Sequence, residues 1–207
     1  MKAITLFSGG KDSFLSTMIA MEHGYDILYG ITIIPDEYSM MFHYPNSGIS
    51  KYPASLLNFE IKYIKEKNFE NYIKNIDNVD AIITGAIASD YQKTRIEKLV
   101  YSEKTIVFSP LWRKKQEYIL EELLLRNIKA MIVSVSAEGF SENDLGKTID
   151  YKYFDHLREI YKMYRINIAG EGGEYESFVY GLNKDEIKIK NKNIIWKNSG
   201  GYLILDI

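Results

Sequence analysis

The sequence of 207 residues contains no cysteine. This absence excludes disulfide bonds, thiolate zinc sites and a cysteine nucleophile or persulfide carrier within the chain. No run of apolar residues approaches the roughly 18 that cross a membrane, and no signal peptide precedes the first apolar segment. We therefore expect a cytoplasmic protein without a membrane partner. The sequence leaves open whether it forms a homodimer.

The sequence also lacks a strong charge of one sign. Its net charge is −2 and its pI is near 6.0, so the overall charge does not predict direct binding to nucleic acid. Hydrophobic residues make up 46% of the chain and charged residues 26%, which is typical of a globular protein. The length fits one domain, or one domain with a small companion.

Apolar segments typical of buried strands alternate with segments of helical periodicity through the first 126 residues. Strands that alternate with helices pair in parallel through right-handed crossovers, so we expect a doubly wound, mostly parallel α/β sheet. The ligand crevice of such a sheet lies at the carboxyl ends of its strands. The expected strands cover residues 3–7, 26–34, 81–84 and 105–108, and the expected helices cover 14–23, 55–67, 69–76, 91–101 and 114–126.

The pattern changes after about residue 127, where short apolar segments follow one another with few helices between them. Consecutive short strands favour antiparallel pairing, which predicts a small α+β subdomain. We place the domain boundary so that residues 1–128 form the main domain and residues 129–207 form the subdomain. The expected elements of the subdomain are a helix at 149–164 and strands at 130–135, 177–181, 186–190 and 201–205.

The turn between the first expected strand and the first helix reads SGGKDS, from Ser8 to Ser13. A helix start offers unpaired backbone N–H groups and a partial positive charge of roughly half a unit. Gly9 and Gly10 remove the side chains that would keep an anion away from that backbone. Lys11 adds a full charge, and the two serine hydroxyls add further donors. The turn therefore predicts a phosphate-binding site.

The spacing within this turn excludes two common phosphate-binding motifs. A Walker loop needs four residues between its first glycine and its Gly-Lys pair, and a dinucleotide fingerprint needs three spaced glycines. SGGKDS instead resembles the PP-loop of the PP-loop ATPase superfamily. The resemblance implies that residues 8–13 bind ATP by its β,γ-pyrophosphate, and that ATP is cut between its α and β phosphates to give an adenylated intermediate.

Two further segments follow the carboxyl ends of expected strands. Gly85 ends a strand at the same sheet edge as SGGKDS, so its backbone is well placed against a nucleotide. Asp90, Gln92 and Arg95 begin the next helix, where the ordinary alternative is a helix cap and a solvated arginine. Trp112 follows a third strand, and a core tryptophan is the usual explanation there.

The segment AGEGGEYESFV, residues 169–179, concentrates carboxylates around two glycines and a tyrosine. Glu171, Glu174 and Glu176 have no histidine nearby, and their spacing does not fit a calcium loop. A solvated acidic turn is the ordinary alternative. However, the glycine pair makes a sharp turn that would hold the carboxylates rigidly before an apolar strand. Carboxylates beside the Tyr175 ring suit a cation, including a quaternary ammonium group.

Taken together, five segments of the sequence resemble the diphthine–ammonia ligase family. GEGGEYESFV is the most discriminating, because other PP-loop enzymes lack it. Ser177 stands where the family usually has threonine, and no match extends beyond Gly181. The five segments are SGGKDS, MFHYPN (residues 41–46), GAIASDYQKTRIE (85–97), SPLW (109–112) and GEGGEYESFV (170–179).

This resemblance implies an ATP-dependent amide ligase that converts diphthine to diphthamide. Diphthine is a modified histidine of translation elongation factor 2 and carries a trimethylammonium group. Its carboxylate would attack the α-phosphate and displace pyrophosphate to form an acyl adenylate, which ammonia then opens with release of AMP. With no cysteine and no visible glutaminase machinery, free ammonium is the expected nitrogen source.

The residues of the expected site fit this chemistry. Lys11 can offset the charge on departing pyrophosphate, and Asp12 can hold Mg²⁺ against the phosphates. We expect nucleotide contacts from residues 8–13 and Gly85. The expected substrate-binding residues are His43, Asp90, Gln92, Arg95, Glu171, Glu174, Tyr175 and Glu176.

Two other functions use the same architecture. A tRNA-thiolating or lysidine-forming PP-loop enzyme usually has a basic RNA-binding surface, and thiolating enzymes often need cysteines, neither of which this sequence has. A nucleotide-binding sensor without chemistry would not require SGGKDS together with the acidic turn, and it would not release pyrophosphate.

Overall fold

The computed structural model describes residues 1–35, 46–101 and 104–207, with the side chain of Gln92 left out. The chain divides into two compact units, Met1–Arg113 (unit 1) and Lys114–Ile207 (unit 2). The division falls earlier than the boundary near residue 128 that we expected, because helix α5 (Gln116–Leu125) contacts strand β6 (Ile128–Val135). Among the helices in these ranges, none combines the length and hydrophobicity needed to cross a bilayer.

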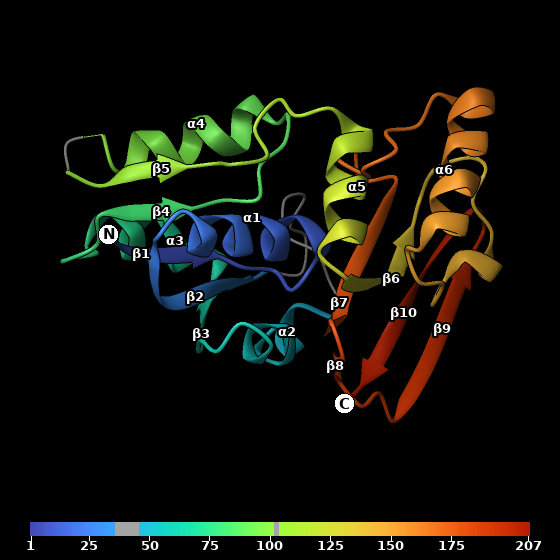
Figure 1. Ribbon diagram of the computed structural model, residues 1–207, viewed down its shortest axis with the longest axis horizontal. Helices are drawn as coiled ribbons and strands as arrows, with labels where there is room; N and C mark the ends of the chain where they lie inside the picture. The colour runs from blue at the N-terminus through green and yellow to red at the C-terminus, as the bar shows by residue number, and fades with distance from the viewer. Residues whose placement is uncertain (36–45, 102–103) are drawn as a thin grey trace. The chain divides into compact units, whose positions relative to one another are not determined.

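Unit 1 contains a five-stranded sheet in the order β3-β2-β1-β4-β5, and every neighbouring pair is parallel (Figure 1). This arrangement confirms the doubly wound α/β fold. The strands are β1 (Lys2–Leu6), β2 (Asp26–Ile34), β3 (Ile61–Lys65), β4 (Ala81–Ile83) and β5 (Ile106–Phe108). The helices are α1 (Lys11–Glu22), α2 (Lys51–Ser55), α3 (Glu66–Lys74) and α4 (Asp90–Leu99), with a 3₁₀ helix η1 at Asn46–Ile49.

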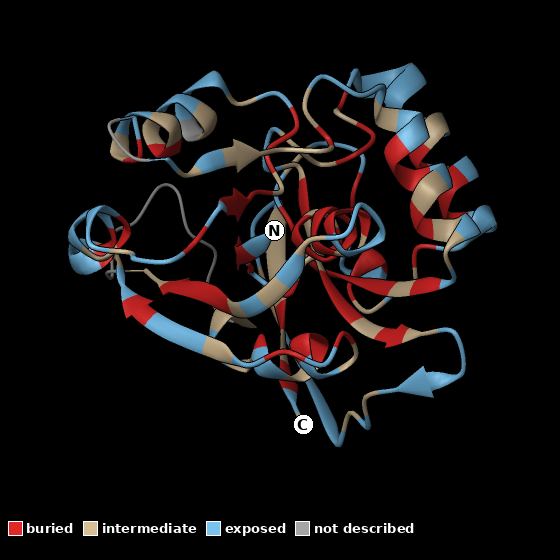
Figure 2. Ribbon diagram, turned by 60° about the vertical axis from the view of Figure 1, so that its left-hand side comes forward, coloured by how far each residue is buried: buried red, intermediate tan, exposed pale blue. Residues whose placement is uncertain are grey.

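Both faces of this sheet are covered, which explains its nearly continuous apolar strands. On β1, Ile4 packs in a cluster with Phe69 and Ile96, from α3 and α4, whereas Ala3 packs on the other face with Ala20 of α1. Figure 2 shows the buried residues of the unit gathered along its strands. The helix that follows β1 (α1) and the helix that follows β4 (α4) therefore lie on opposite faces of the sheet. The switch point between β1 and β4, at the carboxyl ends of these strands, is where sheets of this kind bind ligands.

The prediction of a helix over residues 55–67 is wrong over most of its length, because α2 ends at Ser55 and the chain forms β3 at Ile61–Lys65. This strand pairs with β2 at the edge of the sheet, with Gly30 opposite Ile61. A Cβ at Gly30 would lie 2.6 Å from Ile61 Cδ1 and 2.8 Å from Phe59 Cε2. Because Gly30 has no side chain, Ile61 and Phe59 have room to pack against β2. The pairing of β3 with β2 thus overrides the helical periodicity of the segment.

Unit 2 contains a second five-stranded sheet, antiparallel throughout, in the order β8-β7-β6-β10-β9. An antiparallel α+β unit was expected here. Its remaining strands are β7 (Tyr175–Leu182), β8 (Asp185–Glu186), β9 (Asn191–Lys197) and β10 (Gly200–Asp206), and its other helices are α6 (Tyr151–Tyr164) and the 3₁₀ helix η2 (Glu142–Asp144).

The strand expected at 186–190 is instead the short β8 followed by β9. Asn198 and Ser199 connect β9 to β10, with Lys197 opposite Gly200 in the ladder. Asn198 has φ +53, a conformation that asparagine adopts readily in two-residue hairpin turns. The turn at Asn198 and Ser199, rather than the apolar residues at 186–190, therefore determines the position of β9.

A buried carboxylate organises the approach to α6. Asp144 is 6% exposed and accepts hydrogen bonds from Ser141 N at 2.7 Å, Ser141 Oγ at 2.9 Å and Tyr153 Oη at 3.0 Å, and His156 Nε2 lies 3.2 Å from it. Burial, followed by the charge of Asp144 and the hydrogen bond to it, raises the pKa of the Tyr153 hydroxyl. The carboxylate thus fastens the loop before η2 to the helix that follows.

We predict that Tyr153→Phe lowers the free energy of unfolding by about 1–3 kcal/mol, because a buried carboxylate loses one of its donors. Chemical denaturation measures the change. Tyr161→Phe, on the exposed side of the same helix, is the control and should have little effect. Equal effects of the two substitutions would contradict this role for Asp144.

Candidate functional site

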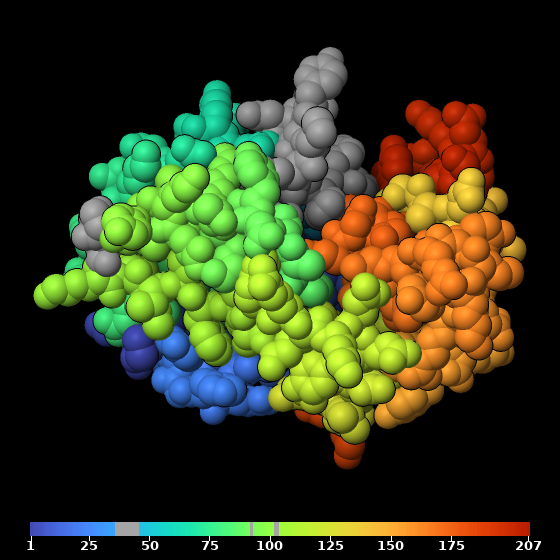
Figure 3. Space-filling model, turned by 90° about the horizontal axis from the view of Figure 1, so that it is seen from above, coloured from blue at the N-terminus to red at the C-terminus, as the bar shows by residue number. Residues whose placement is uncertain are grey.

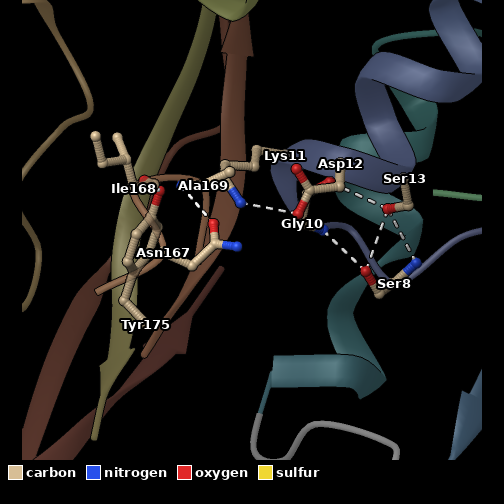
Figure 4. Close-up of polar contacts among 9 residues, drawn as sticks. All are labelled: Ser8, Gly10, Lys11, Asp12, Ser13, Asn167, Ile168, Ala169 and Tyr175. Carbon is tan, nitrogen blue, oxygen red and sulfur yellow. Dashed lines mark hydrogen bonds and ion pairs between the residues drawn. The ribbon is translucent and has the colours of Figure 1, made fainter. Parts of the chain in front are cut away.

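The loop between β1 and α1 is ordered by its own serines (Figure 4). Ser8 Oγ accepts a hydrogen bond from Gly10 N at 3.3 Å, and Ser13 Oγ accepts one from Ser8 N at 3.2 Å while donating to Gly10 O at 3.1 Å. Gly10 is the residue that precedes the helix, and it has no side chain with which to cap it. A helix N-terminus without a side-chain cap is a favourable place for an anion.

Two short polar residues, one on β2 and one immediately before α2, lie against the loop. Gly9 has φ +84, and a Cβ there would lie 3.3 Å from Pro53 Cγ and 3.4 Å from Ser50 Cβ. Ser50 Oγ lies 2.6 Å from Thr32 Oγ1, which itself donates to Phe7 O at 2.5 Å. Both the left-handed backbone and the tight packing require glycine at position 9. The sequence did not lead us to predict the contacts of Thr32 and Ser50 with the loop. The one indication of them in the sequence is a threonine, Thr32, within an otherwise apolar strand.

Lys11 and Asp12 form an ion pair at the start of α1. Lys11 is 3% exposed, and its Nζ lies 2.8 Å from Asp12 Oδ2. The second oxygen, Asp12 Oδ1, is buried and has no hydrogen-bond partner within the described structure. A buried carboxylate oxygen in this state fits the Mg²⁺ that we expected on Asp12. The described residues contain no group of three or more metal-ligating side chains, so the ion would depend on Asp12 together with phosphate oxygens.

Gly85 lies directly against the loop, as expected from the shared sheet edge. It follows β4, and a Cβ at this position would lie 2.9 Å from Ser13 N and 3.0 Å from the carbonyl carbon of Asp12. Thr84 Oγ1 is 2.7 Å from Ser109 Oγ, which ties the end of β4 to the end of β5. The structure thus brings together two segments that are more than seventy residues apart in the sequence.

The expected substrate-binding residues of α4 take different positions. Arg95 pairs with Glu70 of α3, through Nε at 3.0 Å and Nη2 at 2.9 Å, and so fastens the two helices together. Asp90 is exposed, and its Oδ1 lies 3.8 Å from Arg113 Nη2. His43 and the side chain of Gln92 lie outside the described residues. The substrate contacts of all four residues stay predictions.

Trp112 is half-buried rather than part of the core. Lys93 Nζ lies 5.3 Å and Arg113 Cζ 5.6 Å from the centre of its rings, which are distances typical of cation–π contacts. The tryptophan therefore lies in a basic part of unit 1, close to the carboxyl end of β5.

In unit 2, the acidic turn leads into β7, and Figure 4 shows the contacts of Asn167, Ile168, Ala169 and Tyr175 on either side of it. Glu174 Oε1 accepts a hydrogen bond from Asn167 N at 2.7 Å, and Glu174 Oε2 is buried without a partner in the described structure. Ala169 N donates to Asn167 Oδ1 at 2.9 Å. Glu171 and Glu176 are half-buried. Hydrogen bonds from Asn167 N and Ala169 N thus fasten the segment to its own side chains, and Glu174 has one oxygen left for a cation.

Tyr175, whose ring we expected beside a bound cation, is buried. It is 2% exposed, its Oη donates to Ile168 O at 2.8 Å, and its ring lies 5.9 Å from that of Phe140. These contacts give the ring a structural role in unit 2. A contact between its face and a bound cation stays a prediction.

Family comparisons divide the chain as the structure does. The model described as "Diphthamide synthase N-terminal domain" matches residues 1–104, and "Diphthamide synthase C-terminal domain" matches residues 115–207. The chain belongs to the diphthamide synthase family. The gap between the two matches contains the division between unit 1 and unit 2.

Relatives of this diphthamide synthase family member include curated proteins named diphthine–ammonia ligase. The protein from Schizosaccharomyces pombe is 27% identical, over 100% of this chain and 39% of its own length. Those from Mus musculus and Homo sapiens are each 29% identical, over 98% and 94% of this chain and 88% and 85% of their own lengths. The chain thus spans well under half of the yeast protein and most of each mammalian one.

A solved structure with a similar fold comes from Methanocaldococcus jannaschii and is titled as a predicted subunit of tRNA methyltransferase. It superposes with a TM-score of 0.52 and 20% identity, over 89% of this chain and 100% of its own. At this identity the likeness shows the fold alone.

We predict that Gly85→Ala weakens ATP binding at least several-fold, because the added methyl group would press on the backbone of Asp12 and Ser13. Titration with ATP measures the change. Gly48→Ala is the matched control, since a methyl group there meets nothing within 4 Å. Unchanged ATP affinity in Gly85→Ala would contradict the placement of the nucleotide at this loop.

Proposed function

We propose that the protein is an ATP-dependent ligase that converts diphthine on translation elongation factor 2 to diphthamide, with ammonium as the nitrogen source. The observation that carries this proposal is the ordered glycine loop at the switch point of the sheet, with a buried Lys11–Asp12 pair at its helix start. The diphthamide synthase matches and the names of the relatives supply the substrate class. Since translation takes place in the cytoplasm, we place the reaction there.

In this proposal unit 1 binds and activates ATP. The substrate carboxylate would attack the α-phosphate of bound ATP and displace pyrophosphate to give an acyl adenylate. Ammonia would then attack the acyl carbon and displace AMP, which leaves the amide. The loop backbone and Lys11 hold the β,γ-pyrophosphate and stabilise the charge that develops on it. Asp12 would hold Mg²⁺ with its carboxylate, whose Oδ1 is buried without a hydrogen-bond partner in the described structure while Lys11 Nζ contacts Oδ2. Gly85 allows the nucleotide to approach the backbone closely.

The acidic turn of unit 2 supplies the acceptor side of the site. We assign Glu171, Glu174 and Glu176 to the cationic reactants. ATP brings negative charge to the glycine loop, so an ammonium ion or a trimethylammonium group needs a separate acidic partner. Glu174 is the best candidate of the three, because its Oε2 is buried without a hydrogen-bond partner in the described structure.

We predict that Lys11→Met lowers AMP formation by at least about 100-fold, since removing one preorganised group that stabilises transition-state charge typically costs about 3 kcal/mol. Methionine keeps the buried stem of the side chain while it removes the charge. Steady-state AMP formation at saturating ATP measures the effect. Lys74→Met, at an exposed position near the end of α3, should retain full activity.

AMP and pyrophosphate, rather than ADP and phosphate, should be the products of ATP. The turn does not fit a Walker loop and resembles that of enzymes that cut between the α and β phosphates. Chromatography of a reaction with labelled ATP identifies the products. ADP as the main product would contradict the proposed mechanism.

We predict that Glu174→Gln raises the KM for ammonium or diphthine several-fold and leaves the KM for ATP nearly unchanged. Glutamine can still accept the hydrogen bond from Asn167 N, so the turn should keep its shape while it loses the charge. Separate titrations of ATP and ammonium distinguish the two effects. Glu159→Gln, an exposed carboxylate on α6, is the control, and an identical response of both variants would assign Glu174 a structural role only.

A further inference from the structure

Unit 2 contains a cleft that lies outside both the glycine loop and the acidic turn. In Figure 3 the yellow segment around residues 137–143 lies between the orange helix α6 and the red β9–β10 hairpin. The cleft among these elements has a volume of about 710 Å³. Its lining consists of residues 137–143, Tyr164, Trp196, Asn198 and Ser199.

The walls of this cleft are fixed by contacts within unit 2. Ser136, just before the lining loop, donates from its N to Glu174 O at 2.9 Å and from its Oγ to Gly173 O at 2.5 Å. At the other end of the loop, Ser141 is bound to the buried Asp144. Gly139 has φ +93, and a Cβ there would lie 2.7 Å from Tyr164 Cδ2. The loop therefore presses closely on α6, and the cleft is preformed.

The chemistry of the lining is that of a site for an organic cation. Tyr164 is 45% exposed, and the half-buried indole of Trp196 lies against β10, where a Cβ on Gly201 would be 2.6 Å from Trp196 Cε3. Glu138 and Glu142 are exposed, and the described residues of the lining include no lysine or arginine. Aromatic faces combined with carboxylates attract ammonium groups, and a quaternary ammonium suits them because it has no N–H to donate.

We propose that this cleft binds a quaternary ammonium head group. The assignment of its source rests on the proposed function: the trimethylammonium group of diphthine is a cation of this class. The cleft is directly coupled to the acidic turn, through the Ser136 hydrogen bonds and the contact between the Phe140 and Tyr175 rings. If the head group binds in the cleft, the carboxylates of the acidic turn are left to bind the ammonium ion.

The test uses Trp196 as its own reporter. The chain has two tryptophans, so Trp112→Phe leaves Trp196 as the sole source of tryptophan emission. This protein is titrated with tetramethylammonium chloride, with sodium chloride at equal ionic strength as the control, in the absence of ATP and elongation factor. We expect a saturable change in emission with tetramethylammonium only, and weaker binding of n-butylammonium, which represents a lysine side chain.

Variants connect the signal to the cleft. Glu142→Gln should raise the dissociation constant of tetramethylammonium about 2- to 5-fold, the range typical of one exposed charge. Tyr164→Ala should raise it as well, whereas Glu159→Gln, on α6 outside the lining, should not. The proposal is overturned if the titration does not saturate, if sodium chloride has the same effect, if n-butylammonium binds more tightly, or if Glu142→Gln and Glu159→Gln behave alike.

Steady-state kinetics distinguish a failure of the cleft assignment from a failure of the proposed function. Glu142→Gln should raise the KM for diphthine-bearing elongation factor with kcat and the KM for ammonium unchanged. Tetramethylammonium binding without any amidation would contradict the proposed function and leave the cleft assignment intact. Amidation with an unchanged KM for the elongation factor in both Glu142→Gln and Tyr164→Ala would overturn the cleft as a diphthine subsite.

Discussion

A buried lysine at the first residue of a helix is the constraint on which the nucleotide site depends. Burial removes hydration from the Lys11 ammonium, and the positive end of the α1 dipole disfavours a cation at that position. The contact with Asp12 at 2.8 Å offsets part of this cost. The start of α1 therefore carries a positive potential that a bound polyphosphate would relieve, which is the physical reason to assign ATP to this loop.

Both units hold their functional loops with buried polar groups rather than with apolar packing alone. In unit 1, the Thr32–Ser50 pair supports the glycine loop; in unit 2, Asp144 fastens the lining of the cleft to α6. Such groups are stable inside a protein only when their hydrogen bonds are made, so they restrict each loop to one arrangement. Preorganisation of this kind lets a site stabilise charge without reorganising during the reaction.

The sequence predicted the parallel sheet and the closeness of Gly85 to the glycine loop, because parallel strands end at the same edge. It did not predict β3 or the position of β9. The first depends on the space that Gly30 leaves on a neighbouring strand, and the second depends on the turn at Asn198. Pairings across long sequence separations, such as Arg95 with Glu70, have no local signal. The burial of Tyr175 was likewise hidden, because its neighbours in the sequence are glutamates.

The most direct test of the account is the reaction itself. The protein would be incubated with ATP, ¹⁵N-labelled ammonium and diphthine-bearing elongation factor 2, and the modified histidine peptide would be analysed by mass spectrometry. The account predicts that the carboxyl group of diphthine becomes an amide that contains ¹⁵N, and that this depends on ATP. An unmodified diphthine peptide, in a reaction where the protein is folded and binds ATP, would contradict it.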